Sequence, residues 1–271
     1  MTDLDLARAV GACTRAAGKA ILEIYAGSFS VQHKADTSPL TAADLAAQRV
    51  LLEGLARLAP GVPVLSEEAA AAPWSRRQTW ARYWLVDPLD GTREFVKRNG
   101  EFTVNVALIE DGASVLGVVH APVSGELAWA AAGDGAWLQY SPQAIPVRLS
   151  TRSAPAQPVL ACSRSHGSAE EACLIGRLGA HQRLPLGSSL KFLRLAEGRA
   201  DLYLRLGPTS EWDTAAAQCI LEEAGGAVLD LQARPLRYNG KESLLNPPFL
   251  AIGDRARDWH AALGLAGAST A

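Results

Sequence analysis

Six short apolar runs between residues 62 and 138 constrain the fold of this chain most strongly. They are rich in β-branched and aromatic residues: Val62–Leu65, Tyr83–Val86, Phe102–Ile109, Val115–His120, Glu126–Ala131 and Ala136–Leu138. Turn residues separate them, and Glu110-Asp111-Gly112 predicts a hairpin turn. The pattern predicts a mostly antiparallel sheet, whose apolar surface other elements must cover.

Two amphipathic helices are predicted before this sheet. Apolar residues recur three and four positions apart over Leu4–Tyr25, which predicts a helix closed by Gly27. A second helix is predicted over Ala42–Leu58, with Thr41 as its N-cap. A helix pair followed by strands favours layers of helices and sheets.

The second half of the chain alternates short strand and helix patterns and is expected to be α/β. Predicted strands are Val159–Cys162, Gln182–Pro185, Leu202–Leu204, a segment near Val228, and Phe249–Ile252; predicted helices are Ala169–Leu178, Leu190–Glu197, Asp213–Ala224 and Asp254–Leu263. The stretch Tyr140–Pro158 is rich in Pro, Ser, Gln and Ala and predicts a boundary. We therefore expect two halves, residues 1–150 and 151–271.

Composition excludes several classes of protein. The 26 Lys and Arg residues against 28 Asp and Glu residues, without a basic block, predict no nucleic-acid polymer as a partner. The longest charge-free run, Gly112–Gly125, is broken by glycine and proline and is shorter than the roughly 20 apolar residues of a membrane span. The four cysteines are far apart, and the N-terminus is acidic where a signal peptide is basic. These features predict a cytoplasmic protein, with peripheral association at the inner face of the membrane as a second option.

The segment Trp84-Leu85-Val86-Asp87-Pro88-Leu89-Asp90-Gly91-Thr92 is the most informative for chemistry. An apolar strand delivers Asp87 to its carboxyl end, and Asp90 follows three residues later at a turn that Gly91 permits. Two carboxylates held close together repel each other, so a proton or a cation is expected between them. Oxygen ligands favour magnesium, manganese or calcium. The alternative is an ordinary Asp-Pro turn with an Asp N-cap.

Four further segments offer polar groups next to predicted strands or helices: Leu65-Ser66-Glu67-Glu68, Glu211-Trp212-Asp213-Thr214, Gly187-Ser188-Ser189-Leu190-Lys191 and Ser163-Arg164-Ser165-His166. Glu67 would add a bridging ligand if it lay near Asp87, and Asp213 could combine helix capping with metal binding. The segment around Lys191 would suit a phosphate. Each segment also has a simpler interpretation, as a solvated pair, a cap or polar surface.

Two of these motifs together resemble the signatures of the inositol monophosphatase superfamily of lithium-sensitive, magnesium-dependent phosphatases. They are Asp87-Pro88-Leu89-Asp90-Gly91-Thr92 and Trp212-Asp213-Thr214-Ala215-Ala216 with Glu223-Ala224-Gly225-Gly226. Four other segments are similar to the 3′(2′),5′-bisphosphate nucleotidase branch of that superfamily: residues 34–44, 65–68, 187–192 and 242–247. The resemblance spans nearly the whole chain and implies a layered αβαβα sandwich of the inositol monophosphatase/fructose-1,6-bisphosphatase type.

The resemblance also implies two to three Mg²⁺ ions and a role for each matched residue. A first ion is implied on Glu67, Asp87 and the Leu89 carbonyl, a second on Asp87, Asp90 and Asp213, and a third, weaker one near Glu67 on water. Asp44 and Thr92 match the pair that orients and deprotonates the attacking water. Substrate contacts are implied for Gly91, Thr92, His166, Gly187, Lys191 and Asp213.

The implied activity is removal of the 3′-phosphate of adenosine 3′,5′-bisphosphate, giving AMP, with the sulfated precursor as a second substrate and a role in sulfur metabolism. Lys191 and the Ser-Arg-Ser-His segment favour this branch over inositol phosphatases. Inositol monophosphatase or fructose-1,6-bisphosphatase activity is the alternative, and a non-catalytic nucleotide-binding or metal-binding module is a more distant one. A monomer or a homodimer is expected.

Overall fold

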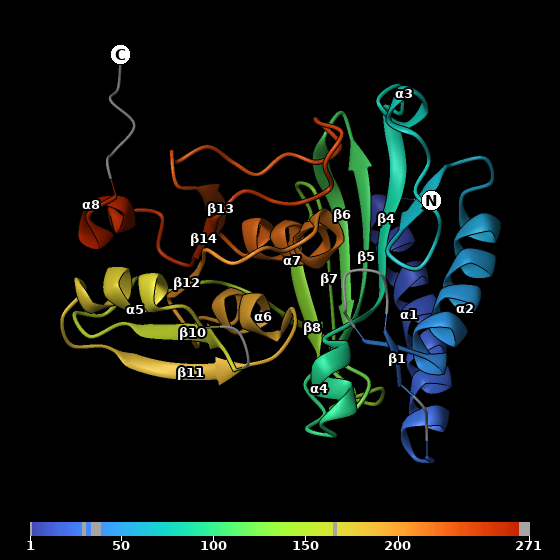
Figure 1. Ribbon diagram of the computed structural model, residues 1–271, viewed down its shortest axis with the longest axis horizontal. Coiled ribbons are helices and arrows are strands. Elements are labelled where there is room, and N and C mark those ends of the chain that lie inside the picture. The colour runs from blue at the N-terminus through green and yellow to red at the C-terminus, as the bar shows by residue number, and fades with distance from the viewer. Residues whose placement is uncertain (1, 29–30, 34–38, 165–166, 266–271) are drawn as a thin grey trace.

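The computed structural model describes residues 2–28, 31–33, 39–164 and 167–265, which form five stacked layers (Figure 1). Two long helices, a seven-stranded sheet, a central helix pair, a five-stranded sheet and two short outer helices follow one another across the molecule. Three apolar cores lie between these layers. The predicted αβαβα sandwich is confirmed.

The first layer consists of α1 (Asp3–Tyr25) and α2 (Ala42–Leu58). Each begins with a capping box, in which Thr2 pairs with Asp5 and Thr41 with Asp44. Their buried faces pack on the seven-stranded sheet. Both predicted helices are confirmed, as is the Thr41 N-cap.

The seven-stranded sheet has the order β3-β4-β5-β6-β7-β8-β9. Its strands are β3 (Val64–Ser66), β4 (Arg82–Asp90), β5 (Thr103–Glu110), β6 (Ala113–His120), β7 (Leu127–Ala131), β8 (Gly135–Gln139) and β9 (Val147–Arg148). Only the β3–β4 pair is parallel. The six predicted strands are confirmed within a few residues, and the predicted hairpin turn joins β5 to β6. The strand β9 lies inside the stretch predicted as a boundary and extends the sheet by one short strand.

The five-stranded sheet is mixed and has the order β11-β10-β12-β14-β13. Its strands are β10 (Val159–Ser163), β11 (Gln182–Leu186), β12 (Leu202–Arg205), β13 (Ala227–Asp230) and β14 (Phe249–Ile252). The helices α6 (Leu190–Ala196) and α7 (Glu211–Glu223) separate it from the larger sheet, while α5 (Ala169–Gly176) and α8 (Trp259–Leu263) cover its outer face. The helix predicted over 254–263 is shorter than expected, because α8 covers only Trp259–Leu263.

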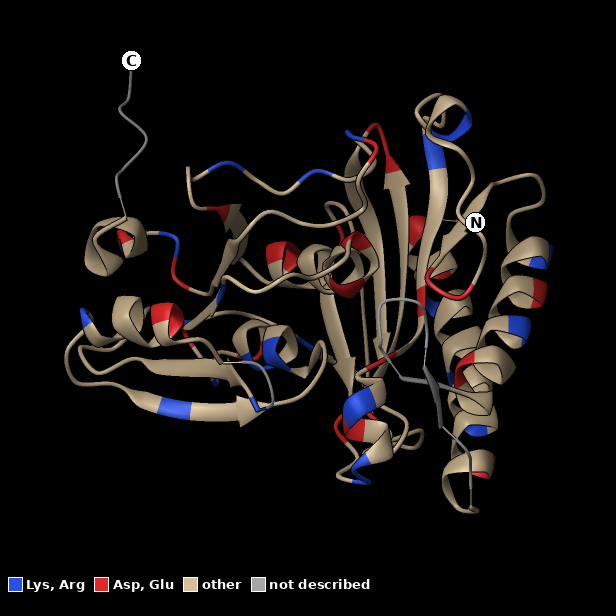
Figure 2. Ribbon diagram, viewed as in Figure 1, with Lys and Arg blue, Asp and Glu red and all other residues tan. Residues whose placement is uncertain are grey.

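The remaining elements are short: β1 (Val31–His33), β2 (Pro39–Thr41), α3 (Trp74–Arg77) and α4 (Thr92–Val96). Among the described residues, every helix is too short or too polar to cross a bilayer. Acidic and basic residues are interspersed over the helices and loops of both halves (Figure 2).

The backbone of α7 contacts the larger sheet at Gly117 of β6, where there is no room for a side chain. A Cβ atom on Gly117 would lie 2.1 Å from the Ala216 carbonyl oxygen, which is a backbone atom and cannot rotate away. We expect Gly117→Ala to lower the free energy of unfolding by about 3 kcal/mol, because the helix must shift to make room. Urea denaturation measures this loss.

Gly176→Ala is the matched control for that measurement. A Cβ atom on Gly176, the last residue of α5, meets nothing within 4 Å, so we expect no loss of stability and a gain of up to about 1 kcal/mol, because alanine favours a helix over glycine. Equal stability of the Gly117→Ala variant and the wild type would contradict the close approach of α7 to the sheet.

Candidate active site

A β-bulge in β4 brings Asp87 and Asp90 to the same side of the strand. Asp87 pairs with Asn105 of β5 and Asp90 pairs with Thr103, so three steps along β4 match two along β5. Residues three apart on a regular strand point to opposite faces, and one extra residue restores the same face. The Asp87 side chain also accepts a hydrogen bond of 3.0 Å from the Leu89 N–H, which braces the bulge.

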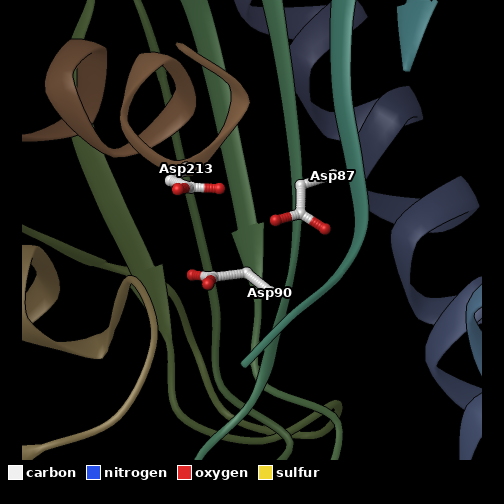
Figure 3. Close-up of side chains that lie close together, drawn as sticks. All are labelled: Asp87, Asp90 and Asp213. Carbon is white, nitrogen blue, oxygen red and sulfur yellow. The ribbon is translucent and has the colours of Figure 1, made fainter. Parts of the chain in front are cut away.

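Asp213 reaches the same point from α7. The helix begins at Glu211 with Ser210 as its N-cap, two residues earlier than predicted, and Asp213 occupies the third helical position. Its Oδ2 atom accepts a 2.8 Å hydrogen bond from the Ser210 N–H, so it does serve the cap as one partner of a capping box. Oxygen atoms of Asp87, Asp90 and Asp213 lie within 4.8 Å of one another (Figure 3).

The electrostatics of this cluster favour a bound cation. Burial raises the pKa of Asp87 and of Asp213 well above the ordinary value, and neighbouring carboxylates raise both further. Burial also raises the pKa of Asp90. Three carboxylates this close together, Asp87 buried and Asp90 and Asp213 half-buried, are not expected to be ionised all at once without opposite charge among them. Their hard oxygen donors fit Mg²⁺, which binds carboxylates and keeps part of its water shell.

Glu67 and Leu89, the other two predicted metal ligands, also line the cavity. Glu67 follows β3, and its N–H donates to the Val86 carbonyl, which ties the end of β3 to β4. Glu67, Leu89 and the three aspartates all line one cavity between the two sheets. Glu67 also faces Asp87 closely enough to raise the pKa of that carboxyl.

Thr92, at the start of α4, lies next to Asp44 in the first turn of α2. The Thr92 hydroxyl lies 3.3 Å from Asp44 Oδ1 and 3.3 Å from the Leu89 carbonyl. The other Asp44 oxygen accepts hydrogen bonds of 2.8 Å and 2.7 Å from the backbone and hydroxyl of Thr41. The N-cap of α2 thus holds Asp44 with one oxygen toward Thr92, 48 residues away in sequence.

Gly91 and Gly187, the two glycines predicted as substrate contacts, both line the cavity. Gly91 has φ +92°, a left-handed conformation, and a Cβ atom there would lie 3.1 Å from the Glu101 carbonyl. The Gly187 N–H donates to Glu101 Oε2 at 2.8 Å. Glu101 also binds Arg164 through two hydrogen bonds of 2.8 Å and 2.6 Å. Glu101 was missed by the sequence analysis, and it holds the Gly187 loop beside the cavity.

Lys191 lies buried in the cavity wall on α6. Its ammonium group donates 2.5 Å to the Ser188 carbonyl and lies 5.1 Å from the centre of the Tyr203 ring. Burial lowers the pKa of Lys191 to about 8, although Asp90 opposes this effect. Arg205 also lines the cavity, so positive charge faces the aspartates across it. His166 lies outside the described residues.

Three side chains that the sequence analysis did not single out hold Asp90. Asn105 and Ser189 donate to its Oδ2 atom at 3.3 Å and 3.1 Å, and the Thr103 hydroxyl, which donates to Asn105 Oδ1 at 2.9 Å, lies 3.4 Å from the same Asp90 oxygen. Thr103 and Asn105 are polar residues inside an otherwise apolar strand segment, and such buried polar residues are a signal that sequence alone offers. Ser189 was considered only as part of a phosphate loop or a helix cap.

Comparisons with known proteins agree with this geometry. A sequence model described as "Inositol monophosphatase family" matches residues 3–263. The chain is 51% identical over 237 residues to the 3′(2′),5′-bisphosphate nucleotidase CysQ of Escherichia coli (strain K12), covering 87% of this chain and 94% of that protein. It is 36% identical over 243 residues to the protein of the same name from Haemophilus influenzae, covering 89% and 90%.

Solved structures show the same fold. CysQ from Bacteroides thetaiotaomicron, described as a bacterial member of the inositol monophosphatase family, superposes with a TM-score of 0.80 at 39% identity, covering 92% of this chain and 97% of that one. An inositol monophosphatase from Anabaena superposes with a TM-score of 0.77 at 27% identity, covering 97% of each chain. The family match over almost the whole chain and the high identity to its members establish that this protein belongs to the inositol monophosphatase family.

Proposed function

We propose that this protein is a Mg²⁺-dependent 3′(2′),5′-bisphosphate nucleotidase that converts adenosine 3′,5′-bisphosphate to AMP and phosphate. The observation that carries the proposal is the convergence of Asp87, Asp90 and Asp213 within 4.8 Å beside a cavity that also contains Lys191. The identity of 51% to a protein named for this activity supports the choice of substrate. The sulfated precursor is a second proposed substrate.

Glu67, Asp87 and the Leu89 carbonyl would hold one ion, and Asp87, Asp90 and Asp213 a second. Glu67 would hold a third ion through water. When bound, these ions supply positive charge that stabilises the oxygens of the phosphate and of the leaving group and makes a nearby water more acidic. Phosphate monoester hydrolysis is extremely slow without a catalyst, so charge stabilisation of this kind is needed.

Thr92 and Asp44 would orient the attacking water. The Thr92 hydroxyl accepts a hydrogen bond from the water and donates its own proton toward Asp44 Oδ1, which lies 3.3 Å away. Asp44 is buried, its Oδ2 atom accepts hydrogen bonds from Thr41, and its Oδ1 atom lies toward Thr92. The pair therefore provides a path by which the water can lose a proton as it attacks.

The second phosphate and the nucleoside would lie along the wall formed by α6 and the loop before it, which is next to the Gly91 turn. Lys191 and Gly187 are the proposed contacts there, while Gly91 and Thr92 contact the phosphate that is removed. His166, which lies outside the described residues, is a further proposed substrate contact. Asp213 is a further proposed contact to the substrate. A protonated Lys191 suits a second phosphate because that group carries up to two negative charges near neutral pH.

Phosphate release from a substrate panel tests the proposal. We expect release from adenosine 3′,5′-bisphosphate with Mg²⁺ and background release after chelation. Inositol 1-phosphate and fructose 1,6-bisphosphate should react at least about a hundredfold more slowly, since a well-placed charged contact can supply about 2 to 3 kcal/mol of discrimination. Lys191→Met should raise the KM of the bisphosphate and leave that of inositol 1-phosphate unchanged.

Two results would contradict the proposal in different ways. A hundredfold preference for inositol 1-phosphate would assign the same site to the alternative substrate class. Tight binding of the nucleotide in calorimetry, with no product formed in the presence of Mg²⁺, would favour a non-catalytic binding module.

The cellular location of the protein and the division of its chain into two halves are also proposals. All four cysteines are free, which supports a reducing compartment such as the cytoplasm; peripheral membrane association and the choice between monomer and homodimer stay predictions. The strands of the larger sheet end at Arg148 and those of the smaller sheet begin at Val159. This supports halves of 1–150 and 151–271 with the active site between them.

A further inference from the structure

Ser189 joins the two parts of the proposed metal site through one buried hydroxyl. Its side chain is fully buried. The Oγ atom lies 3.1 Å from Asp90 Oδ2, on the larger sheet, and 3.1 Å from the backbone carbonyl of Asp213, on α7. Asn105 donates to the same hydroxyl at 3.0 Å.

The hydroxyl of Ser189 is not used to cap its own helix. Ser189 precedes α6, but it makes no side-chain cap hydrogen bond, and its backbone has φ −69° and ψ −2°. An N-cap serine normally has an extended backbone and accepts hydrogen bonds from the first helical turn. The ordinary reason for a serine at this position is therefore absent, and the hydrogen bonds to the aspartates are its remaining use.

The hydrogen bonds to Asp90 are concentrated on one of its two oxygens. Asn105 and Ser189 both donate to Oδ2, and Ser189 is the nearer at 3.1 Å; the Thr103 hydroxyl lies 3.4 Å from this oxygen and donates to Asn105 Oδ1 at 2.9 Å. Carboxylates that bind metal ions are commonly oriented by hydrogen bonds from outside the coordination sphere. Hydrogen bonds to Oδ2 restrict the rotation of the Asp90 carboxylate, which lines the cavity and would bind the ion.

The Ser189 hydroxyl has one proton, so it can donate either to Asp90 Oδ2 or to the Asp213 carbonyl, but not fully to both. An ionised carboxylate is a stronger acceptor than a neutral carbonyl, so with a cation present the proton is expected on Asp90. The Ser189 oxygen then still accepts from Asn105 and remains packed against the Asp213 carbonyl. Asp90 is thus held from β5 on one side and from the start of α6 on the other.

We propose that Ser189 is a positioning residue that sets the geometry between Asp90 and Asp213 and thereby the affinity of the site for Mg²⁺. The inference rests on the proposed function in one respect, namely that these two aspartates share an ion. Ser189 itself touches neither substrate nor ion; it acts through the two aspartates.

Mg²⁺ binding measured by calorimetry on substrate-free protein tests this proposal. We expect Ser189→Ala to weaken Mg²⁺ binding by about tenfold, the lower end of the effect of removing a hydrogen bond that orients a metal ligand. The Mg²⁺ concentration for half-maximal nucleotidase activity should rise by the same factor. At saturating Mg²⁺, kcat should change less than that concentration does.

Ser114→Ala is the matched control, because Ser114 also donates to a backbone carbonyl of α7, that of Ala215 at 2.8 Å. It contacts no carboxylate of the cluster, so we expect a similar loss of thermal stability with unchanged Mg²⁺ affinity. Ser189→Thr keeps the hydroxyl and should restore most of the affinity. If Ser189→Ala does not fold, Thr103→Val removes the hydroxyl that orients Asn105, the other donor to Oδ2, and should weaken Mg²⁺ binding by a smaller factor.

The results separate this inference from the proposed function. An active wild type whose Mg²⁺ affinity is the same as that of Ser189→Ala overturns the positioning role and leaves the function intact. If the wild type hydrolyses no nucleotide but Ser189→Ala binds Mg²⁺ more weakly than the wild type does, the proposed function is overturned and the positioning role is supported. Equal loss of Mg²⁺ affinity in Ser189→Ala and Ser114→Ala also overturns the role, because it shows a general effect on packing.

Discussion

Asp90→Asn is expected to lower the turnover of adenosine 3′,5′-bisphosphate by at least about a hundredfold while leaving the fold intact. The substitution keeps the size of the side chain but removes one negative charge from the cluster that would hold the ion. Oxygens of Asp87 and Asp213 remain within reach of the same point, but with one charge fewer they should bind Mg²⁺ more weakly. Steady-state kinetics at increasing Mg²⁺ concentrations measure both effects.

The same variant should also be no less stable than the wild type when magnesium is absent. Burial raises the pKa of Asp90 above its value in the unfolded chain. A carboxyl of this kind favours the folded state at low pH, and that contribution is lost as pH rises through the folded-state pKa. At neutral pH the asparagine avoids this cost, so the melting temperature of metal-free Asp90→Asn should equal or exceed that of the wild type.

Asp134→Asn provides the control for the Asp90 variant, since Asp134 is exposed in the turn between β7 and β8. It should retain wild-type turnover and a wild-type rise in melting temperature on adding Mg²⁺. Wild-type turnover in Asp90→Asn would refute the assignment of the site.

Thr92→Ala is expected to cause a loss of similar size, at least about a hundredfold in kcat, for a different reason. The hydroxyl is the group that links the water to Asp44, 3.3 Å away, and its removal leaves the carboxylate ligands untouched. Mg²⁺ binding measured by calorimetry should therefore stay within about twofold of the wild type, whereas Asp90→Asn weakens it.

Two companion variants make the Thr92 result specific. Thr92→Ser keeps the hydroxyl and should recover most of the turnover. Asp44→Asn should impair turnover as well, and combining it with Thr92→Ala should cost little more than either change alone, because residues that act as one unit are not additive. Additive losses would show that Thr92 and Asp44 act independently and would contradict the proposed water-activating pair.

Much of the fold was predictable because the signals for it are local. The stripe from Leu6 to Ile24 and the N-cap at Thr41 predicted α1 and α2 at nearly their observed bounds. The start of α7 was placed two residues late, although Ser210 and Asp213 have the spacing of a capping box. The strand β9 was missed because a two-residue strand has no periodicity to detect.

The candidate site was predictable only as a set of residues. The motifs around Asp87 and Asp213 marked the carboxylates, but they lie on a strand and on a helix that are distant in sequence. The roles of Glu101 and Ser189 depend on contacts 63 and 99 residues away in the chain. Such contacts leave no periodic pattern in a single sequence, so sequence analysis could not find them.

The sequence by itself determined where helices and strands form and which side chains could serve a phosphatase, because periodicity, capping and turn preferences act between near neighbours. Only the tertiary structure decided that the extra residue in β4 turns Asp87 and Asp90 to one side, and that Gly117 lets α7 carry Asp213 up to them. The physical reason is that convergence depends on the register between strands and on how closely a helix can approach a sheet, and both are set by packing across the whole core.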